Sequence, residues 1–581
     1  MKRAAAILAA WAMLLPAQKP EDDTILKAMR EEITRAKGLK FEGVPDPIYF
    51  VEYGLDDVRS MSASASLGAL LRSDENRSRV PRVLVRVGSP AFDNTNYLYT
   101  DLFGSARAGG GVPLDDDLTG LRRYFWLATD RVYKGSVEAL TRKRAALRNI
   151  TQQEKLNDFA PAQPTKVYQN PLEPKIRKAP WEKLTRELSA VMSAFPKVTS
   201  SQVDFEADFG NSYYVNSEGS EARYPDGFFF VRTVASAQAA DGMTVRDALM
   251  VVGRNLDKMP AQADLARGIE QIGRNVTALI DAPVLDDYSG PILFEDIAAP
   301  QLMAHLLGAN LGLTRQPVIE PGRQFPAPES ELEGRKGSRV LPEWMDVVDD
   351  PVRSEWRGQE LQGVYPVDMD GVVPQPLKVV NNGTLENFLL SRTPVRGFEG
   401  SNGRGRLPGP FGSKAAVFSN LFVTAKQSVS NAELRKKFLE MVTQRGKAYG
   451  IIIRKLDMPA SGSLDELRRQ TQRGGNSRPV AMPLMVYRVT PDGKEELVRG
   501  VRFRALNARS LRDITAASTT ESIFHFAGNG SPLPVMGQGG YVALHSVVSP
   551  ALLFEDLELE KRQEDWPKLP VVPPPPLVSS R

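Results

Sequence analysis

Apolar, alternating segments joined by two-residue turn signals are the feature that most restricts the fold of this chain. Asn382-Gly383 divides the segment "PLKVVNNGTLENFLL", and Asp492-Gly493 divides "LMVYRVTPDGKEELVRGVRF". Asn-Gly and Asp-Gly readily adopt the positive φ angles of tight hairpin turns, while alternation of apolar and polar residues is typical of half-buried strands. The second half of the chain is therefore predicted to be rich in antiparallel strands.

Strands and helices are both expected in the first half of the chain. Alternation predicts strands within residues 48–90 and 203–235, with turns at Glu218-Gly219 and at Asp226-Gly227. Apolar residues also recur at helical spacing in several segments, and an aspartate cluster precedes one of them as a candidate N-terminal cap. Over the whole chain, helices are expected at residues 22–39, 114–147, 181–194, 296–309 and 431–446.

The pattern of the chain changes near residue 285, where helices give way to strands. A chain of 581 residues is too long for a single hydrophobic core. An α+β architecture is predicted, with an α/β N-terminal domain over residues 18–284 and a β-rich C-terminal domain over residues 285–562. Residues 563–581 are rich in proline, so a polyproline-like tail is expected there.

Residues 1–17, "MKRAAAILAAWAMLLPA", have the layout of a cleavable secretory signal peptide. Two cations precede an apolar run from Ala4 to Leu15, and cleavage is expected after Ala17. The run is shorter than the about 20 residues that a membrane-spanning helix needs, although a retained anchor is the alternative. The sequence therefore predicts an exported protein, periplasmic or extracellular, without a stable membrane anchor.

The charge balance and the absence of cysteine exclude several classes of function. Lys and Arg total 74 and Asp and Glu total 70, a net charge of +4 that is too small to indicate nucleic-acid binding. The chain has no cysteine, so disulfides, thiolate metal ligands and thiol nucleophiles are excluded.

Two short motifs resemble known ligand loops but lack the required residues. The glycine-rich run "RGFEGSNGRGRLPGPFGSK", residues 396–414, lacks the spacing of a phosphate-binding loop and is interpreted as a mobile loop over a groove. It also contains a near match to a nucleophile elbow, in which Glu399 replaces the first glycine. "VDMDG", residues 367–371, begins like a calcium loop but has no later ligands, so a turn is expected.

The chain has three histidines, His305, His525 and His545. A catalytic zinc takes three protein ligands, commonly histidines, and keeps one position open. His305 lies on a predicted helix ten residues after Glu295, at a phase that keeps the two side chains apart. The other two histidines lie in apolar, strand-like segments, where a histidine is more often a core or edge residue than a metal ligand.

An ordered set of segments resembles the TldD/PmbA family, also called the modulator-of-gyrase family. The segments include "ASLGALLRSDENRSRVPRVLVRVGSPAFDNTNY", "LDDDLTGLRRYFWLATDRVYK", "YYVNSEGS", "YSGPILFEDIAAPQLMAHLLG", "VYPVDMDGVVPQPLKVVNNGTLENFLLSRTP", "SNGRGR", "FSNLFV" and "VVSPALLFEDLEL". They follow the family's order and span nearly the whole mature chain, which is most similar to the secreted, TldD-related metallopeptidases. The resemblance implies an α/β N-terminal domain, a β-rich C-terminal domain, and dimers around a shared inner cavity.

The metal motif of the family is degenerate in this chain. Zinc-bearing TldD-type subunits have His-Glu-x-x-x-His and a distant cysteine, whereas their PmbA-type partners lack these ligands. Laid on this chain, the motif falls on residues 294–299 in the stretch "GPILFEDIAAPQLMAHLLGAN". Glu295 matches the general-base position, but Phe294 and Ala299 replace both histidines. No cofactor is therefore predicted, and Glu295 is expected to cap the helix that follows.

Three functions are compatible with the sequence. The first is a pseudoenzyme, the non-metal, PmbA-like subunit of a peptide-hydrolysing assembly, as a homodimer or as a heterodimer with a ligand-bearing TldD-type paralogue. The second is a peptidase in its own right, with Glu295, Asp296 and one histidine as non-standard metal ligands. The third is a non-catalytic peptide-binding or scaffolding protein.

Overall fold

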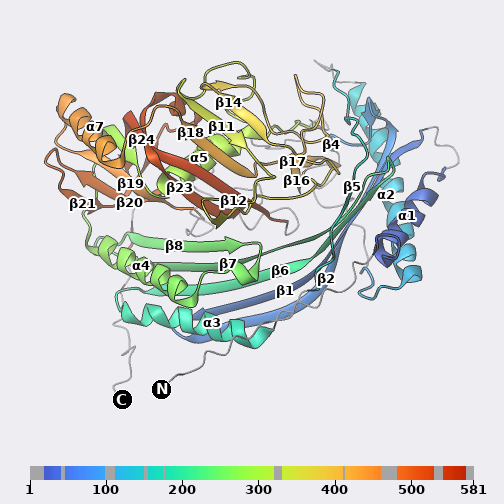
Figure 1. The fold of residues 1–581 in the computed structure, drawn as a ribbon, viewed down its shortest axis with the longest axis horizontal. Coiled ribbons are helices and arrows are strands. Elements are labelled where there is room, and N and C mark those ends of the chain that lie inside the picture. The colour runs from blue at the N-terminus through green and yellow to red at the C-terminus, as the bar shows by residue number, and fades with distance from the viewer. Residues whose placement is uncertain are drawn as a thin grey trace, which may run out of the picture.

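The structure, a computed structural model, describes most of the chain (Figure 1). The described residues are 19–40, 46–98, 111–148, 155–173, 177–319, 330–409, 412–458, 480–528, 541–564, 566–568 and 570. The predicted signal peptide, residues 1–17, lies outside them, as do residues 571–581 of the predicted tail. Within the described ranges, no helix combines the length and the apolar character that crossing a membrane requires.

Long antiparallel strands form the sheet of the N-terminal domain, which curves beneath the C-terminal domain (Figure 1). β1 has 19 residues and β2 has 21, so at about 3.3 Å per residue each strand is roughly 60 to 70 Å long. In spatial order the strands are β3 (Phe92–Asp93), β2 (Ala69–Ser89), β1 (Ile48–Ser66), β6 (Ser200–Asn216), β7 (Glu221–Gln238) and β5 (Lys166–Tyr168), with β8 (Thr244–Gly253) also paired to β7.

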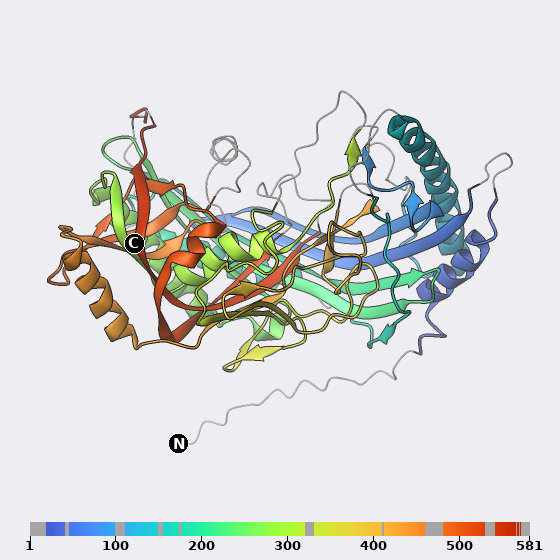
Figure 2. The same cartoon turned by 90° about the horizontal axis from the view of Figure 1, so that it is seen from above.

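Helices cover the convex face of this sheet at both of its ends (Figures 1 and 2). Leu55 and Met61 of β1 point to this face, where Leu55 packs in one core with the first two helices and Met61 packs in another with the next two. Because side chains alternate along a strand, Val58 faces the opposite, concave side. The helices are α1 (Thr24–Ala36), α2 (Leu118–Leu147), α3 (Lys178–Ala190) and α4 (Gln262–Asp281).

A larger mixed sheet forms the centre of the C-terminal domain. Its strand β24 is parallel to β18 and antiparallel to β9, and β9 is in turn parallel to β19. In spatial order the strands are β15 (Thr384–Leu385), β14 (Leu377–Asn381), β11 (Met345–Asp349), β18 (Asn420–Ala425), β24 (Ala543–Lys561), β9 (Tyr288–Phe294), β19 (Gly450–Leu456), β20 (Pro483–Val489) and β21 (Glu495–Val498), with β22 (Val501–Arg504) and β23 (Ile514–Gly528) also paired to β24.

Shorter elements complete the described fold. After β9, α5 (Ala298–Met303), a π-helical turn (Ala304–Gly308) and α6 (Ala309–Leu311) form one helical segment. α7 (Asn431–Gln444) lies at the end of the molecule opposite α1 and α2 (Figures 1 and 2). The other elements are the strand pairs β4 (Tyr97–Leu98) with β10 (Val318–Ile319), β12 (Glu355–Trp356) with β13 (Gln359–Glu360) and β16 (Gly405–Pro408) with β17 (Lys414–Ala416), and the 3-10 turns Val191–Ala194, Leu256–Lys258 and Ala508–Asp513.

The predicted α+β fold class is confirmed, and so are both hairpins on which it was based. Asn382-Gly383 joins β14 to β15, and both residues have positive φ, +46° and +72°. Asp492-Gly493 lies between β20 and β21, with Gly493 at φ +88°. These turns were predictable because the conformation is dictated by the dipeptide itself.

The turn predicted at Asp226-Gly227 is wrong, because both residues lie inside β7. β6 approaches so closely there that a Cβ on Gly227 would lie 2.4 Å from the backbone oxygen of Asp208. Gly227 is therefore needed for the close approach of β6 and β7, and it does not mark the end of a strand.

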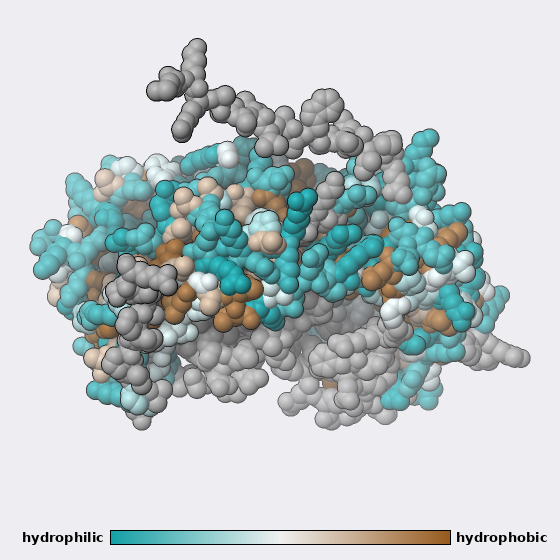
Figure 3. All heavy atoms as spheres, turned by 90° about the horizontal axis from the view of Figure 1, so that it is seen from below, coloured by the Kyte–Doolittle hydropathy of each residue, from teal (hydrophilic) through white to brown (hydrophobic). Residues whose placement is uncertain are grey.

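Buried ion pairs join the two domains. Arg246 of β8 pairs with Asp457 at 2.8 Å, and Lys455 of β19 pairs with Asp247 of β8 at 2.6 Å. These contacts fix the edge of the N-terminal sheet against the central sheet of the C-terminal domain. On the face seen from below, the coloured residues are mostly hydrophilic, with separate hydrophobic areas among them (Figure 3).

Candidate functional site

The two positions that correspond to metal-binding histidines of the motif are core positions. Phe294, the last residue of β9, has its ring centroid 5.5 Å from that of Phe554 and 6.0 Å from that of Phe503. Ala299 belongs to the same hydrophobic core, and both side chains are fully buried. Zinc requires imidazole, thiolate or carboxylate donors, so neither position offers a ligand.

Glu295, between these positions, is held by two arginines. Arg435 of α7 donates from Nε and Nη2 to the two carboxylate oxygens, both at 2.7 Å, and Arg454 of β19 donates from Nε at 3.4 Å. Both oxygens that a general base would use to accept a proton are therefore engaged. The prediction that Glu295 caps the next helix is wrong: the N-cap residue of α5 is Ile297, no side chain caps it, and the arginines hold the carboxylate instead.

The π-helical turn after α5 is a second place where the two histidines of the metal motif, which are five residues apart, could lie on one helical face, because its backbone hydrogen bonds join residues five apart. Residues 294–299, in contrast, include a strand end and a left-handed turn, so their two ends do not share a helical face. A His-Glu-x-x-x-His motif placed on the π-helical turn would fall on Met303, Ala304 and Gly308. This alternative placement also provides no imidazole or carboxylate.

His525 and His545 are packed as neutral core residues on β23 and β24. The Nδ1 atom of His525 lies 2.9 Å from the Ser546 hydroxyl, and burial lowers the pKa of His525 to about 4. The His545 ring stacks on Phe526 at 4.7 Å, and burial lowers its pKa well below the usual value. His305 lies in the π-helical turn. Across the described ranges, His, Asp and Glu side chains form no group of three that could hold a metal ion.

The stretch "VDMDG" is a turn, as predicted. The Asp368 carboxylate accepts hydrogen bonds from the backbone N–H groups of Asp370 at 3.0 Å, Val372 at 2.9 Å and Gly405 at 3.0 Å. Burial, together with the neighbouring charge of Asp370, raises the pKa of Asp368 well above its usual value.

The glycine-rich run is mostly exposed at residues 396–400 but packed into the domain from Gly403 to Leu407, so its interpretation as a mobile loop is wrong for this second part. The run forms β16, and Arg404 immediately before this strand is 1% exposed and pairs with Asp349 at 3.0 Å. The packing places the next arginine of the run, Arg406, against a cavity.

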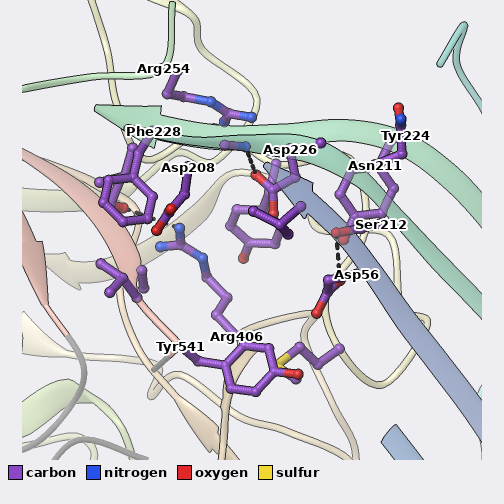
Figure 4. Close-up of a pocket in the computed structure, with 18 of the residues that line it drawn as sticks. Asp56, Asp208, Asn211, Ser212, Tyr224, Asp226, Phe228, Arg254, Arg406 and Tyr541 are labelled. Carbon is purple, nitrogen blue, oxygen red and sulfur yellow. Dashed lines mark hydrogen bonds between the residues drawn. The ribbon is translucent and has the colours of Figure 1, made fainter. Parts of the chain in front are cut away.

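That cavity, of about 310 Å³, lies between the concave face of the N-terminal sheet and the C-terminal domain (Figure 4). Its lining includes both charged and aromatic side chains from the two domains. The lining residues that carry the argument are Asp56, Arg82, Asp208, Ser212, Tyr224, Asp226, Phe228, Arg254, Tyr365, Arg406 and Tyr541. The sequence analysis assigned none of them to a site. The signal that could have found this face is the alternation along β6, where odd-numbered residues are buried and even-numbered residues such as Asp208 are polar and only half-buried.

One wall of the cavity carries charges that neutralise one another. Arg82 forms an ion pair with Asp56 and donates to the Tyr541 hydroxyl at 2.9 Å. Ser212 donates to the other oxygen of Asp56 at 2.8 Å (Figure 4). The Arg82 side chain crosses β1 at Gly54, where a Cβ would lie only 2.6 Å from its Nε. Because Gly54 has no side chain, Arg82 can pass over it and reach Asp56 and Tyr541.

Four further charged residues line the cavity and form no ion pairs within the described residues, namely Asp208, Asp226, Arg254 and Arg406. Arg406 donates to two backbone carbonyl oxygens, at 2.8 and 3.1 Å, and its guanidinium carbon lies 4.5 Å from the centroid of the Tyr365 ring. Burial raises the pKa of both aspartates and lowers that of Arg406. These groups are the part of the cavity best placed to meet a ligand.

Comparison with known proteins relates this architecture to one family. Residues 289–457 match the model of the PmbA/TldA metallopeptidase C-terminal domain. No curated protein matches the chain significantly in sequence.

Solved structures share the fold over nearly the whole chain. A Thermotoga maritima MSB8 protein named as a modulator of a DNA gyrase has 14% identity and a TM-score of 0.56, over 92% of this chain and 99% of its own. TldE from Thermococcus kodakarensis has 12% identity and a TM-score of 0.54, over 92% and 100% of the two chains. A Bacteroides thetaiotaomicron VPI-5482 protein, also named as a modulator of DNA gyrase, has 10% identity and a TM-score of 0.51, over 94% and 99%. The chain therefore carries a region that matches the PmbA/TldA metallopeptidase C-terminal domain over residues 289–457, and it shares the fold of these solved structures over nearly its whole length.

Proposed function

We propose that this chain is the non-metal, PmbA-like subunit of an exported peptide-hydrolysing assembly. The packing at the motif positions is the observation that supports this role most directly. Phe294 and Ala299 are core side chains, and Glu295 is engaged by Arg435 and Arg454. These residues do not fit a zinc ion, so the proposal assigns metal-assisted hydrolysis to a ligand-bearing TldD-type paralogue in a heterodimer.

Co-expression of the tagged mature chain with a relative that carries an intact His-Glu-x-x-x-His motif tests the pairing. We expect the two chains to co-purify and to hydrolyse an unstructured peptide together. Changing the motif glutamate of the relative to glutamine should abolish hydrolysis, whereas E295Q in this chain should leave it at the level of the unchanged pair. Hydrolysis that survives the change in the relative would contradict the assignment.

The metal content of the purified, tag-free chain, measured by mass spectrometry without added zinc, tests the same proposal independently. We expect transition metals well below one per chain. Stoichiometric zinc would overturn the proposal and would favour the alternative of a peptidase that uses Glu295, Asp296 and a histidine.

Substitutions around Glu295 separate that alternative further. R435Q removes the bidentate partner of the carboxylate, and E295Q removes the carboxylate itself. If the isolated chain hydrolyses peptides with Glu295, E295Q should abolish the hydrolysis. R435Q should alter the rate of hydrolysis, because it frees the Glu295 carboxylate from its bidentate partner. Under our proposal, the wild type and both variants stay at background.

Export is the remaining part of the proposal, and it rests on residues 1–17. We expect the protein recovered outside the cytoplasm to have the mass of a chain that begins at Gln18. The variant L8R, which interrupts the apolar run, should retain the full-length mass and stay in the cytoplasm. Export of uncleaved wild-type protein would contradict the cleavage.

A further inference from the structure

A second, smaller cavity of about 120 Å³ lies on the C-terminal domain, between two segments that are remote in the sequence. One segment is the turn of residues 331–340, and the other is the 3-10 turn Ala508–Asp513. The Glu331 carboxylate accepts a hydrogen bond from the Ala508 backbone N–H at 2.7 Å, and Leu332 packs in one core with Ala508. These contacts hold the two walls of the cavity against each other.

Arginines dominate the lining of this cavity. Arg335 and Arg339 come from the first segment, and Arg509 and Arg512 come from the second. Glu331 is the one carboxylate that lines it, so four positive charges and one negative charge give the lining a net charge of +3. The remaining lining residues carry no charge and are Leu332, Ser338, Val340 and Ala508.

The protein leaves most of this positive charge unpaired. Among the described residues, Arg335, Arg509 and Arg512 form no ion pair. Arg339 has a long, exposed pair with Glu343, at 3.7 Å. Like charges gathered around one hollow raise the local concentration of ions of the opposite sign. The lining is therefore suited to an anion.

The arginines are accessible to such an anion. All four are exposed, so water solvates them and the cluster costs the fold little. Arg512 also donates from Nε to the carbonyl oxygen of Arg509 at 3.2 Å, which ties its guanidinium group to the 3-10 turn. A guanidinium group held in place loses less conformational freedom when a ligand binds.

The number of arginines and the size of the cavity indicate the class of anion. A guanidinium group binds a phosphate through two parallel N–H···O bonds, and a phosphate monoester carries about −1.5 to −2 charges and three acceptor oxygens. A carboxylate has two oxygens and one charge, so it would engage fewer of the four arginines. The volume of about 120 Å³ is far below the about 300 Å³ of a typical small-molecule site, so it suits one compact group.

From these observations we propose that the cavity is an anion site that binds a terminal phosphate group, carried by a soluble compound or by a lipid headgroup. Arg335, Arg339, Arg509 and Arg512 bind its oxygens. The site goes beyond the subunit role proposed above and does not depend on it, because it uses neither a metal nor a paralogue.

Isothermal titration calorimetry of the full mature chain with inorganic phosphate and with glycerol phosphate tests the proposal. Succinate, which carries two carboxylates, is the comparison ligand. We expect saturable binding of both phosphates at millimolar concentration in low salt, and weaker binding of succinate. Raising the salt to about 0.15 M should weaken phosphate binding, because the arginines are exposed and their charges are screened.

Substitutions assign the binding to the cavity. R335Q and R512Q should each weaken phosphate binding about two- to fivefold, the effect of losing one exposed ion pair, and the double variant should weaken it about tenfold. The double variant R335K/R512K keeps both charges but loses the bidentate geometry, so its affinity should lie between those of the wild type and R335Q/R512Q. R123Q, at an exposed arginine of α2 in the other domain, removes one charge far along the chain and should bind like the wild type.

Co-sedimentation with vesicles distinguishes the two sources of the phosphate. The vesicles are phosphatidylcholine with phosphatidic acid, and pure phosphatidylcholine is the control. Binding to the first kind alone that is lost in R335Q/R512Q assigns the phosphate to a lipid headgroup. Any other result with the vesicles, together with saturable binding of free phosphate, assigns it to a soluble compound.

Three results would overturn the proposal: no saturable binding of either phosphate by the wild type, equal affinity for succinate, or equal weakening by R123Q and R335Q/R512Q. Melting temperatures by circular dichroism identify a variant that fails to fold, and R335K/R512K then replaces it. Since these assays measure anion binding by the isolated chain, their failure leaves the metal-content and co-purification tests unaffected.

Discussion

Arg392 of the C-terminal domain lies over the ring of Phe159, with its guanidinium carbon 3.9 Å from the ring centroid. Arg86 of β2 lies at the same distance from the same ring. Each arginine is neutralised, Arg86 by Asp93 at 2.7 Å and Arg392 by Glu218 at 2.7 Å. Phe159 thus joins three segments that are remote in the sequence, and it does so at the junction of the two domains.

The first prediction concerns this junction. F159A should lower the free energy of unfolding by about 3–5 kcal/mol, because a fully packed ring is replaced by a cavity. F159L keeps most of the apolar volume but loses the attraction between ring and cations, so a smaller loss of about 1–2 kcal/mol is expected. Urea unfolding followed by circular dichroism measures both. A leucine variant as stable as the wild type would show that the cation–π contacts contribute nothing.

The second prediction concerns the ion pair between Asp247 and Lys455. Asp247 is fully buried, pairs with Lys455 at 2.6 Å and accepts a hydrogen bond from Asn275 at 2.7 Å. D247N leaves the lysine without its anion, so stability should fall by about 3–5 kcal/mol in urea unfolding. D281N, which breaks an exposed pair with Lys197, is the control and should cost less than about 1 kcal/mol. Similar losses in the two variants would contradict the structural assignment.

The third prediction concerns Glu206, which lies between Asp204 and Asp208 on the concave face of β6. Burial, with the charges of Asp208 and Asp204, raises the pKa of Glu206 to about 7 from 4.5. The folded chain therefore binds a proton that the unfolded chain has released, and stability falls as the pH rises from about 4.5 to about 7.

E206Q removes this loss. At pH 8 the variant should be more stable than the wild type by about 1–2 kcal/mol after allowance for solvent screening, and near pH 4.5 the two should be equal. Urea unfolding at several pH values measures the difference. E75Q, on the exposed part of β2, is the control and should show no such trend. A constant difference between E206Q and the wild type would contradict the raised pKa.

The fourth prediction concerns His525, whose pKa is lowered by burial to about 4 from 6.5. The unfolded chain takes up a proton below pH 6.5, whereas the folded chain does so only near pH 4, so stability falls as the pH decreases through this window. H525N keeps a polar atom near Ser546 but cannot titrate. The wild type should lose roughly 2–3 kcal/mol more than H525N between pH 7 and pH 4 in urea unfolding. Parallel pH profiles would contradict this.

Local features of the fold were predictable from the sequence because few residues determine them. Asn382-Gly383 forms a hairpin by its own backbone preference, and Asp117 caps α2 from the position directly before the helix. The same local reasoning predicted that Glu295 caps the next helix. That prediction failed because Arg435, 140 residues away in the sequence, binds the carboxylate instead.

The cavity could not be predicted, because no short segment contains it. Alternation along β1 shows that Asp56 and Val58 share a face, but it does not show which part of the chain packs opposite them. Asp226-Gly227 was also misleading, since a glycine required for contact between strands has the same sequence signature as a turn. The arginines of the cavity, Arg254 and Arg406, come from different domains and meet only in the folded chain.

The environment of Phe294 and Glu295 also determines how a metal site introduced at these positions would affect stability. An imidazole at position 294 would be enclosed by Phe503 and Phe554, which offer its nitrogens no hydrogen-bond partner from their side chains. A glutamate turned toward a metal would leave Arg435 without its bidentate partner. Each such substitution is therefore destabilising on its own, and building a metal site here would require several changes at once. The packed core around Phe294 and the two arginines that hold Glu295 thus stabilise the arrangement without metal ligands.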